Sequence, residues 1–136
     1  MNYWLVKFAP FRYSWNDCLK NGKFEIYSVR NFQARNNLQA MKIGDAVLFY
    51  HSQEDHRIMG VMKVIQEAHP DPTTSDPRWI SVTFEPVETF TNPVLLVEIK
   101  QDSELAGIGL IIQPRLAVMC LTIPEFSRII EMSKSG

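Results

Sequence analysis

The segment from residue 29 to residue 37 concentrates the side chains best suited to recognising a polar ring. It reads Val-Arg-Asn-Phe-Gln-Ala-Arg-Asn-Asn, so two arginines, three asparagines and one glutamine surround a single aromatic residue. Asn and Gln side chains offer both donors and an acceptor, which suits reading the edge of a base, and Arg offers a planar fork for phosphate or for stacking. The alternative is a polar, solvated helix start at which Asn31 only caps the helix.

Aromatic residues on the expected strands support the first interpretation. Trp4, Phe49, Tyr50 and Trp79 lie on three such strands, where an aromatic-lined cleft could hold a flat ring. Aromatic residues on strands also commonly belong to the core. Their weight therefore comes from occurring together with the Asn/Gln/Arg segment.

Sequence motifs for catalysis or metal binding are absent. There is no Walker loop, GxGxxG, HExxH, nucleophile elbow or EF-hand loop, and the three histidines have neither ligand spacing nor a cysteine cluster nearby. His51 and Ser52 are adjacent on a strand and point to opposite faces, so they do not make a triad. We expect no catalytic residue, no metal and no cofactor.

Charge and composition set the class of protein. The apolar and charged fractions, 46% and 21%, are those of an ordinary globular protein, and the net charge of −1 argues against strong nonspecific nucleic-acid binding. Residues 1–50 nevertheless carry seven Lys/Arg against three Asp/Glu. This asymmetry fits either a basic patch or separately solvated faces.

Length and hydropathy predict a single domain over residues 1–136 that does not enter a membrane. The chain has the commonest size of one domain, and no apolar run approaches the ~20 residues that span a bilayer. The first residues show no export signal, so we expect the cytoplasm as compartment. The sequence leaves the oligomeric state open.

Hydrophobic periodicity and turn residues divide the chain into short elements. The predicted strands cover residues 1–7, 46–50, 58–65 and 79–85, with further strand material at 94–99 and 115–121. The predicted helices cover residues 15–21 and 32–42, a short stretch near 101–107 and a final helix after 122. Ser14 with Asp17 and Thr122 with Glu125 resemble capping boxes.

The order of these elements predicts the fold class. Regular βαβ alternation is absent, and the proline-rich residues 69–78 form an exposed loop. We expect an α+β fold in which a small mixed β-barrel or strongly curved sheet carries short flanking helices.

Several blocks of the chain resemble the EVE domain family. They are Tyr3–Lys7, Tyr13–Trp15, residues 29–38 and residues 41–52, followed in order by residues 68–72, 77–79, 84–87 and 116–118. The resemblance implies a PUA-like fold, akin to YTH and ASCH domains, without catalytic activity. It also implies a reader of modified bases in DNA or RNA, notably modified cytosine, that takes a flipped base into a pocket.

The resemblance assigns expected roles to eleven residues. The pocket walls would be Trp4, Tyr50 and Trp79. The groups that read a base edge or shape the pocket would be Asn31, Gln33, Asn36 and Ser52. The groups that meet phosphate or a ring face would be Lys7, Arg30 and Arg35. His51 would do either, or would hold a neighbouring backbone.

Three departures from the family pattern bear on the ligand. Phe8-Ala9-Pro10 replaces the usual Ser-Glu-Pro, Tyr27-Ser28 replaces a Trp–Gly pair, and residues 113–117 replace a Ser-Arg-Leu-Ser run. The alternative to a nucleic-acid strand is a free nucleoside-like ligand, which the near-neutral charge and the single domain favour. A base-modifying enzyme with His51 as acid or base is the least favoured function. Binding to a strand should weaken steeply with salt, whereas nucleoside binding should hardly respond.

Overall fold

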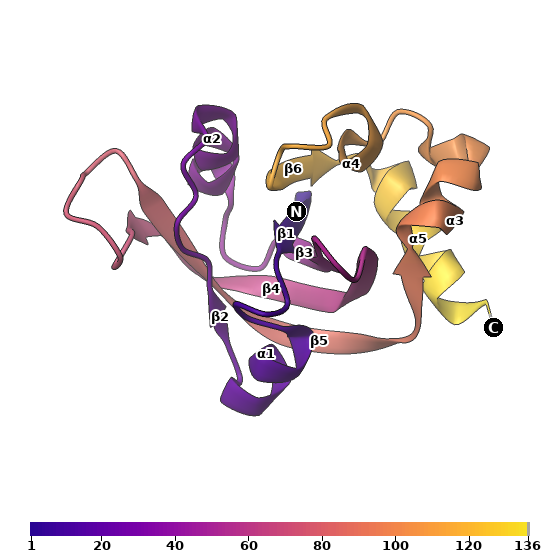
Figure 1. The fold of residues 1–136 in the computed structure, drawn as a ribbon, viewed down its shortest axis with the longest axis horizontal. Coiled ribbons are helices and arrows are strands. Elements are labelled where there is room, and N and C mark those ends of the chain that lie inside the picture. The colour runs from indigo at the N-terminus through magenta and orange to yellow at the C-terminus, as the bar shows by residue number, and fades with distance from the viewer. Residues whose placement is uncertain (136) are drawn as a thin grey trace.

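A six-stranded mixed sheet forms the centre of the structure, a computed structural model that describes residues 1–135 (Figure 1). Residue 136 of the expected domain lies outside the described residues. The strands are β1 (Tyr3–Phe8), β2 (Phe24–Glu25), β3 (Ala46–His51), β4 (Arg57–Pro70), β5 (Ile80–Leu95) and β6 (Val118–Leu121). Their order in the sheet is β2-β5-β4-β3-β1-β6; β1 and β3 are parallel and the other pairs are antiparallel.

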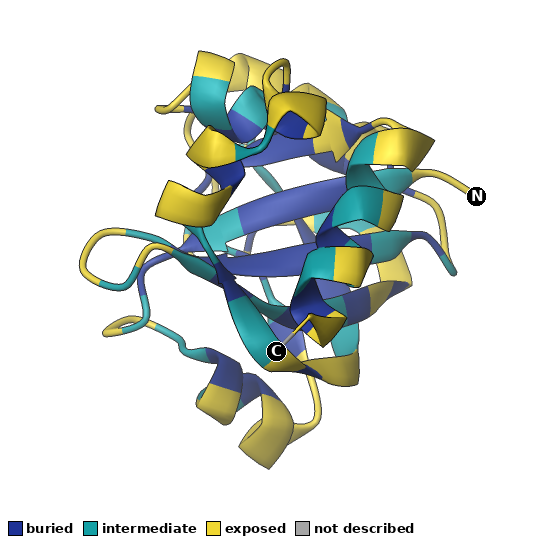
Figure 2. Cartoon of the chain, turned by 90° about the vertical axis from the view of Figure 1, so that its right-hand side faces the viewer, coloured by how far each residue is buried: buried dark blue, intermediate teal, exposed yellow. Residues whose placement is uncertain are grey.

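Short helices flank the sheet, which confirms the α+β class. They are α1 (Trp15–Asn21), α2 (Phe32–Ala40), α3 (Leu96–Gln101), α4 (Gly109–Ile112) and α5 (Ile123–Lys134), with a 3-10 turn at Ser103–Leu105. Figure 1 shows α2 on one side of β6 and the α3–α5 group on the other, and both α2 and α4 pack against that strand. Figure 2 shows buried residues on the strands and exposed ones on the outer helix faces. No helix within residues 1–135 is long and apolar enough to cross a membrane.

The sheet is not closed, so the predicted barrel is not confirmed and the strongly curved sheet describes the structure. Strands β2 and β6 stand at its two edges, and β2 has only two residues with which to pair. Curvature comes instead from β4 and β5, whose pairing shifts register at four places. Such bulges bend a strand and increase its twist without closing the sheet.

Most predicted elements are present, with shifted ends. Helix α1 has the predicted bounds, and both capping boxes form. Residues 94–99 are not a strand: they hold the end of β5 and most of α3. The predicted helix near 101–107 is reduced to the 3-10 turn, and β2 and α4 have no counterpart among the predicted elements.

The parallel pair β1/β3 positions the residues that matter for function. Lys7 lies opposite Tyr50 and Phe8 opposite His51 at the carboxyl ends of the two strands, and the Ser52 N–H donates to the Phe8 carbonyl. The Lys7 N–H donates to the carbonyl of Ala117, just before β6. Three segments that are distant in sequence therefore meet at the carboxyl ends of β1 and β3.

Candidate functional site

Two adjoining cavities open at the carboxyl ends of β1 and β3. One, the aromatic pocket, has a volume of about 300 Å³ and is walled by Phe8, Tyr27 and the residues around them. The other, the tyrosine pocket, has a volume of about 490 Å³ and reaches from Tyr50 to α3 and α4. Both are lined in common by Lys7, Ser52, Gln53, Arg115 and Ala117. A ligand can therefore extend from one cavity into the other.

Two aromatic rings and a guanidinium make the wall of the aromatic pocket. The rings of Phe8 and Tyr27 meet edge-to-face with centroids 5.1 Å apart. The guanidinium carbon of Arg12 stands 4.7 Å from the Phe8 centroid and 4.9 Å from the Tyr27 centroid. The wall thus already holds a flat cation against two rings. Because Phe8 is buried, the half-buried Tyr27 is the ring that a flat heterocycle would contact.

A buried carboxylate holds the loop behind Tyr27. Asp71 accepts hydrogen bonds from the Ser28 N–H (2.8 Å), the Arg30 guanidinium (3.0 Å), and the N–H and hydroxyl of Thr73 (2.7 and 2.6 Å). Ser28 has a left-handed backbone (φ 61°), a conformation that few non-glycine residues adopt. The four hydrogen bonds stabilise this turn and fix the direction in which Tyr27 and Arg30 leave it.

Asn31 has a structural role as well as a place in the pocket. Its side-chain oxygen accepts from the Ala34 N–H (2.9 Å) and caps α2, as the sequence predicts. The residue also lines the aromatic pocket. Its amide N–H groups stay available to a ligand.

His51 is buried and engaged through both ring nitrogens. Its Nε2 accepts from the Trp15 N–H at the start of α1 (2.9 Å), and its Nδ1 lies 2.7 Å from Asp55 Oδ2. Because the backbone N–H must donate, Nε2 carries no proton and Nδ1–H donates to the carboxylate. His51 thereby joins α1 to the loop after β3, and it lines neither pocket.

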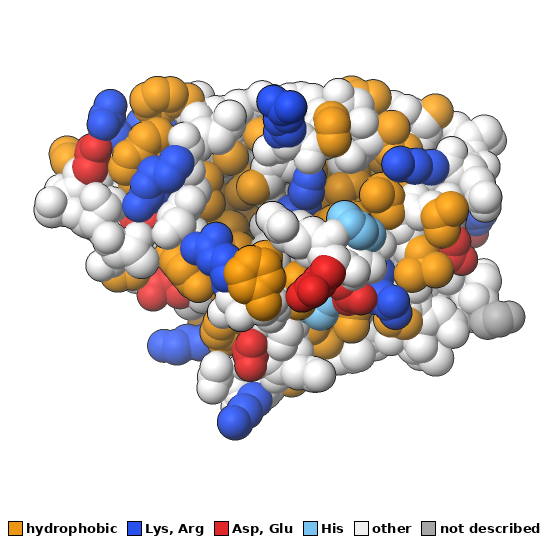
Figure 3. All heavy atoms as spheres, viewed as in Figure 1, with side chains coloured by type: hydrophobic (Ala, Val, Ile, Leu, Met, Phe, Trp, Pro, Cys, Tyr) orange, Lys and Arg blue, Asp and Glu red, His pale blue; other side chains and the backbone are white. Residues whose placement is uncertain are grey.

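The two pockets carry positive charge without negative charge. Within residues 1–135 their lining includes Lys7, Arg12, Arg30 and Arg115 but no carboxylate side chain. Arg30 is balanced by Asp71 just behind the wall. Figure 3 shows basic side chains around hollowed hydrophobic areas on one face of the molecule. Such a site favours an anionic or electron-rich ligand.

Burial lowers the pKa of Lys7, the cation that lies between the two pockets. The half-buried Lys7 ammonium donates to the Pro114 carbonyl (2.6 Å), and desolvation lowers the pKa of Lys7 below its ordinary 10.5. Tyr50, nearby, is buried as well, which raises the pKa of its hydroxyl to about 12. At neutral pH the lysine is a cation and the tyrosine a neutral donor.

The structure brings only part of the predicted site together. Lys7, Arg30, Asn31, Tyr50 and Ser52 line the two pockets. Gln33 lies with Asn31 and residues 113–116 at a shallower neighbouring cavity. The predicted residues found elsewhere are Trp4, Arg35, Asn36, His51 and Trp79.

Three of these residues form a surface cluster on α2, where Arg35 and Asn36 belong to the helix and Trp79 packs beside it. The Trp79 ring lies 5.1 Å from Phe32, and the Arg35 guanidinium lies 5.2 Å from the Phe32 centroid. Asn36 is exposed, and its side-chain oxygen accepts from Arg35 (2.8 Å). The cluster suits contacts along a strand more than it suits enclosure of a base.

Trp4 lies in the core instead of walling either pocket. Its ring is 5% exposed, and its indole N–H donates to Asp45 Oδ2 (3.0 Å). Asp45 also accepts from the N–H groups of Asn2 and Lys42. Trp4 therefore joins β1 to the turn before β3.

We expect Trp4→Phe to reduce stability without changing ligand affinity. The change leaves a buried carboxylate oxygen of Asp45 short of one donor, which costs about 2 kcal/mol. Urea unfolding and titration with an oligonucleotide containing modified cytosine would measure the two quantities. Lost binding at unchanged stability would show that Trp4 contacts the ligand.

The pocket residues without a predicted role come from segments far apart in sequence. They include Phe8, Arg12, Tyr27, Gln53, His56, Leu96, Leu110, Pro114 and Arg115. The sequence marked Phe8 and Tyr27 as candidates, because both occupy positions where the chain departs from the family pattern. No sequence feature marked Arg12 and Arg115, since only the folded chain brings them to the same opening.

An open, curved mixed sheet with short flanking helices and a parallel β1/β3 pair defines a PUA-like fold. The fold agrees with that of the Mmi1 YTH domain (TM-score 0.61, 14% identity, 98% of this chain and 96% of that one). The EVE domain family model matches residues 2–132. The chain belongs to the EVE domain family.

The similarity to other proteins extends over most of the chain. Thymocyte nuclear protein 1 of Mus musculus is 31% identical, covering 98% of this chain and 74% of the relative, and that of Homo sapiens is 31% identical, covering 78% and 57%. A protein from Agrobacterium tumefaciens has a TM-score of 0.95 at 38% identity, covering 98% of this chain and 93% of its own. Human THYN1 in complex with 5-methylcytosine-containing DNA has a TM-score of 0.92 at 27% identity, covering 100% and 99%.

Proposed function

We propose that this protein is a noncatalytic reader of a modified base, foremost a modified cytosine, in DNA or RNA. The aromatic pocket would receive the flipped base, and the surrounding cations would hold the strand. The observation that carries the proposal is the carboxylate-free aromatic pocket, found in a chain whose whole length matches the fold of a protein in complex with 5-methylcytosine-containing DNA.

The pocket offers the contacts that a base requires. Tyr27, which is half-buried and backed by the buried Phe8, supplies the ring face, and stacking on such a ring contributes about 1–3 kcal/mol per base. The amide of Asn31 and the side chains of Ser52 and Gln53 would read the base edge. A methyl group on the base would meet apolar lining such as Ala117.

Phosphate contacts would come from basic groups around the openings. Lys7, Arg30 and Arg115 line the pockets, and Arg35 lies in the cluster on α2. Trp79, Gln33 and Asn36 would then contact the strand outside the pocket. Electrostatic contacts of this kind make affinity fall as salt rises.

The absence of catalysis is part of the proposal. An acid or base near the ring would be needed to modify it. The described carboxylates lie outside the pocket lining, and both nitrogens of His51 are already bonded to Trp15 and Asp55. Lys7 does line the pocket, and its ammonium already donates to the Pro114 carbonyl. The cytoplasm stays the predicted compartment.

A sensor of a free nucleoside is the second candidate. The net charge of −1 and the volume of about 300 Å³, enough for a single ring, favour it. Titration of oligonucleotides with modified and plain cytosine at two salt concentrations separates the two functions. Preference for the modified base with salt-dependent affinity supports the reader, and salt-independent binding of the nucleoside alone supports the sensor.

Removing the Tyr27 ring should weaken binding of the modified base about tenfold. Tyr27→Ala deletes one stacking surface, whereas Tyr27→Phe keeps the ring and is the matched control. Fluorescence anisotropy with a labelled oligonucleotide containing 5-methylcytosine would measure both variants, and circular dichroism would verify their fold. Equal affinity of Tyr27→Ala and wild type would exclude this pocket as the base site.

A further inference from the structure

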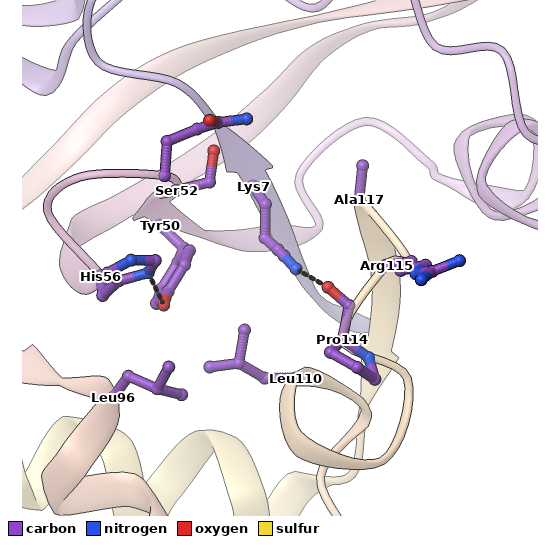
Figure 4. A pocket seen from close by; sticks show the side chains of 10 residues that line it. Lys7, Tyr50, Ser52, His56, Leu96, Leu110, Pro114, Arg115 and Ala117 are labelled. Atoms are coloured by element: carbon purple, nitrogen blue, oxygen red, sulfur yellow. Dashed lines mark hydrogen bonds between the residues drawn. The ribbon is translucent and has the colours of Figure 1, made fainter.

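The tyrosine pocket is a large cavity that the proposed base site leaves unfilled. Its lining is apolar along α3 and α4, with Leu96, Leu110 and Pro114, and polar at Tyr50 and His56. The Tyr50 hydroxyl lies 3.3 Å from His56 Nδ1. Figure 4 shows this pair on one side of the pocket, Leu96 and Leu110 below, and Lys7 between Tyr50 and Pro114.

Lys7 stands where the two cavities join, and its charge lacks a counter-ion. Its ammonium has three donors, of which one is used by the Pro114 carbonyl. Lys63, Arg57, Arg78 and Arg128 each pair with a carboxylate, but no such pair involves Lys7 within residues 1–135. A half-buried cation that has lost part of its water without gaining an anion favours binding of an anionic group.

The backbone at the same opening adopts uncommon conformations. Gln53 (φ 69°) and His56 (φ 50°) both have left-handed φ values, and both line the tyrosine pocket. Such conformations in non-glycine residues cluster at ligand sites. Here they turn the loop after β3 so that the His56 ring reaches Tyr50.

Together these features point to a ligand that is longer than one base. A phosphate placed at Lys7 would have an aromatic pocket on one side and a half-apolar, half-polar pocket on the other. A flipped nucleotide in a strand is covalently joined through such a phosphate to its neighbour. The volume of about 490 Å³ is ample for one nucleoside.

We propose that the two pockets bind two successive nucleotides, with the linking phosphate at Lys7 and the neighbour of the modified base in the tyrosine pocket. This inference rests on the proposed function. Leu96 and Leu110 would contact the neighbour's ring or sugar, and Tyr50 and His56 would hydrogen-bond its polar atoms. Arg115, exposed at the rim, would add a second contact to the phosphate.

The test compares 5-methyl-2′-deoxycytidine with dinucleotides that carry 5-methylcytosine at either the 5′ or the 3′ position. Isothermal titration should show one dinucleotide binding at least about tenfold more tightly than the nucleoside, since a second stacked base and a phosphate both contribute. Lys7→Met should remove most of the salt dependence of this gain.

Blocking the tyrosine pocket should abolish the gain in affinity of the dinucleotide over the nucleoside and leave nucleoside binding unchanged. Leu96→Trp fills the cavity from α3, and Val97→Trp places the same bulk on the next, 55% exposed residue outside it. We expect Leu96→Trp to bind the dinucleotide no better than the nucleoside, and Val97→Trp to behave as wild type. His56→Gly is a second variant in case Leu96→Trp fails to fold, because glycine readily adopts the left-handed φ of this position. It should reduce the gain in affinity by removing the hydrogen-bond partner of Tyr50.

The outcomes separate this inference from the proposed function. Nucleoside binding without any dinucleotide gain, or a gain that survives both Leu96→Trp and His56→Gly, overturns the two-nucleotide site and leaves the base reader intact. No binding of the nucleoside, the dinucleotides or longer strands overturns both.

Discussion

Replacing Asp71 with asparagine should lower the free energy of unfolding by about 3 kcal/mol and weaken binding in the aromatic pocket. The carboxylate is fully buried and accepts four hydrogen bonds from Ser28, Arg30 and Thr73. An amide nitrogen cannot accept, so donors on one side lose their partner and Arg30 loses its counter-charge. Breaking a buried charged pair from one side costs about 3–5 kcal/mol, and the partial exposure of Arg30 places this case at the lower end.

The same carboxylate makes stability depend on pH. Burial alone would raise the pKa of Asp71, but hydrogen bonds from Thr73, Arg30 and Ser28 outweigh burial and lower the pKa to about 2. Because the folded pKa is below the unfolded one, the stabilisation is present above about pH 4 and is lost as the pH falls through about 2. About 2 kcal/mol of the difference between wild type and Asp71→Asn should therefore disappear on acidification.

Urea unfolding followed by tryptophan fluorescence, from neutral pH to about pH 2, would measure this difference. Glu85→Gln is the control, since it removes a carboxylate that pairs with Lys63 on the surface and should change stability by less than about 1 kcal/mol. A gap between wild type and Asp71→Asn that stays constant across the pH range would contradict the assignment.

Replacing Gly60 with alanine should destabilise the protein by about 3 kcal/mol. An alanine Cβ would lie 2.5 Å from the Trp15 ring carbon Cζ2 and even closer to the Glu88 carbonyl oxygen. The carbonyl belongs to paired β5 backbone, and the Trp15 ring is 1% exposed, so neither has free space to move into. Overpacking of this kind typically costs about 1–3 kcal/mol, and contact with backbone places it at the upper end.

The effect should extend to α1, because Trp15 fastens that helix. Its indole N–H donates to Thr89 Oγ1 (2.9 Å), and its backbone N–H donates to His51. Gly107→Ala is the matched control, since its Cβ would meet no atom within 4 Å. Thermal unfolding of the two variants would measure the difference. Equal melting temperatures for Gly60→Ala and wild type would show that the Trp15 ring moves aside freely.

Local sequence signals were sufficient where structure depends on neighbouring residues. The capping boxes at Ser14 and Thr122 and the cap at Asn31 predicted the starts of α1, α5 and α2, because caps act within three residues. Alternation at Ile80, Val82 and Phe84 likewise predicted the first part of β5. Such patterns fix an element and its faces before any tertiary contact forms.

Tertiary pairing overrode local signals in two places. Strand β5 continues through Pro86, beyond the predicted strand over residues 79–85. The pairing shifts register next to that residue, and the missing N–H is tolerated there. Residues 96–99 are rich in branched side chains and predicted a strand, yet they belong to α3. There the Glu98 carboxylate accepts from the Leu95 N–H (2.9 Å) and stabilises the helix start.

For the site, the sequence by itself determined the family and the kinds of side chain available for recognising a base. Only the tertiary structure decided which of them meet. Trp4 is the type of residue that commonly walls a base pocket, but its indole is buried in the core, where its N–H donates to Asp45. Phe8 and Tyr27 lie nineteen residues apart in sequence and form the wall because the loop held by Asp71 returns to the end of β1. Strand periodicity tells which residues share a face, whereas a pocket depends on long-range packing that brings several such faces together.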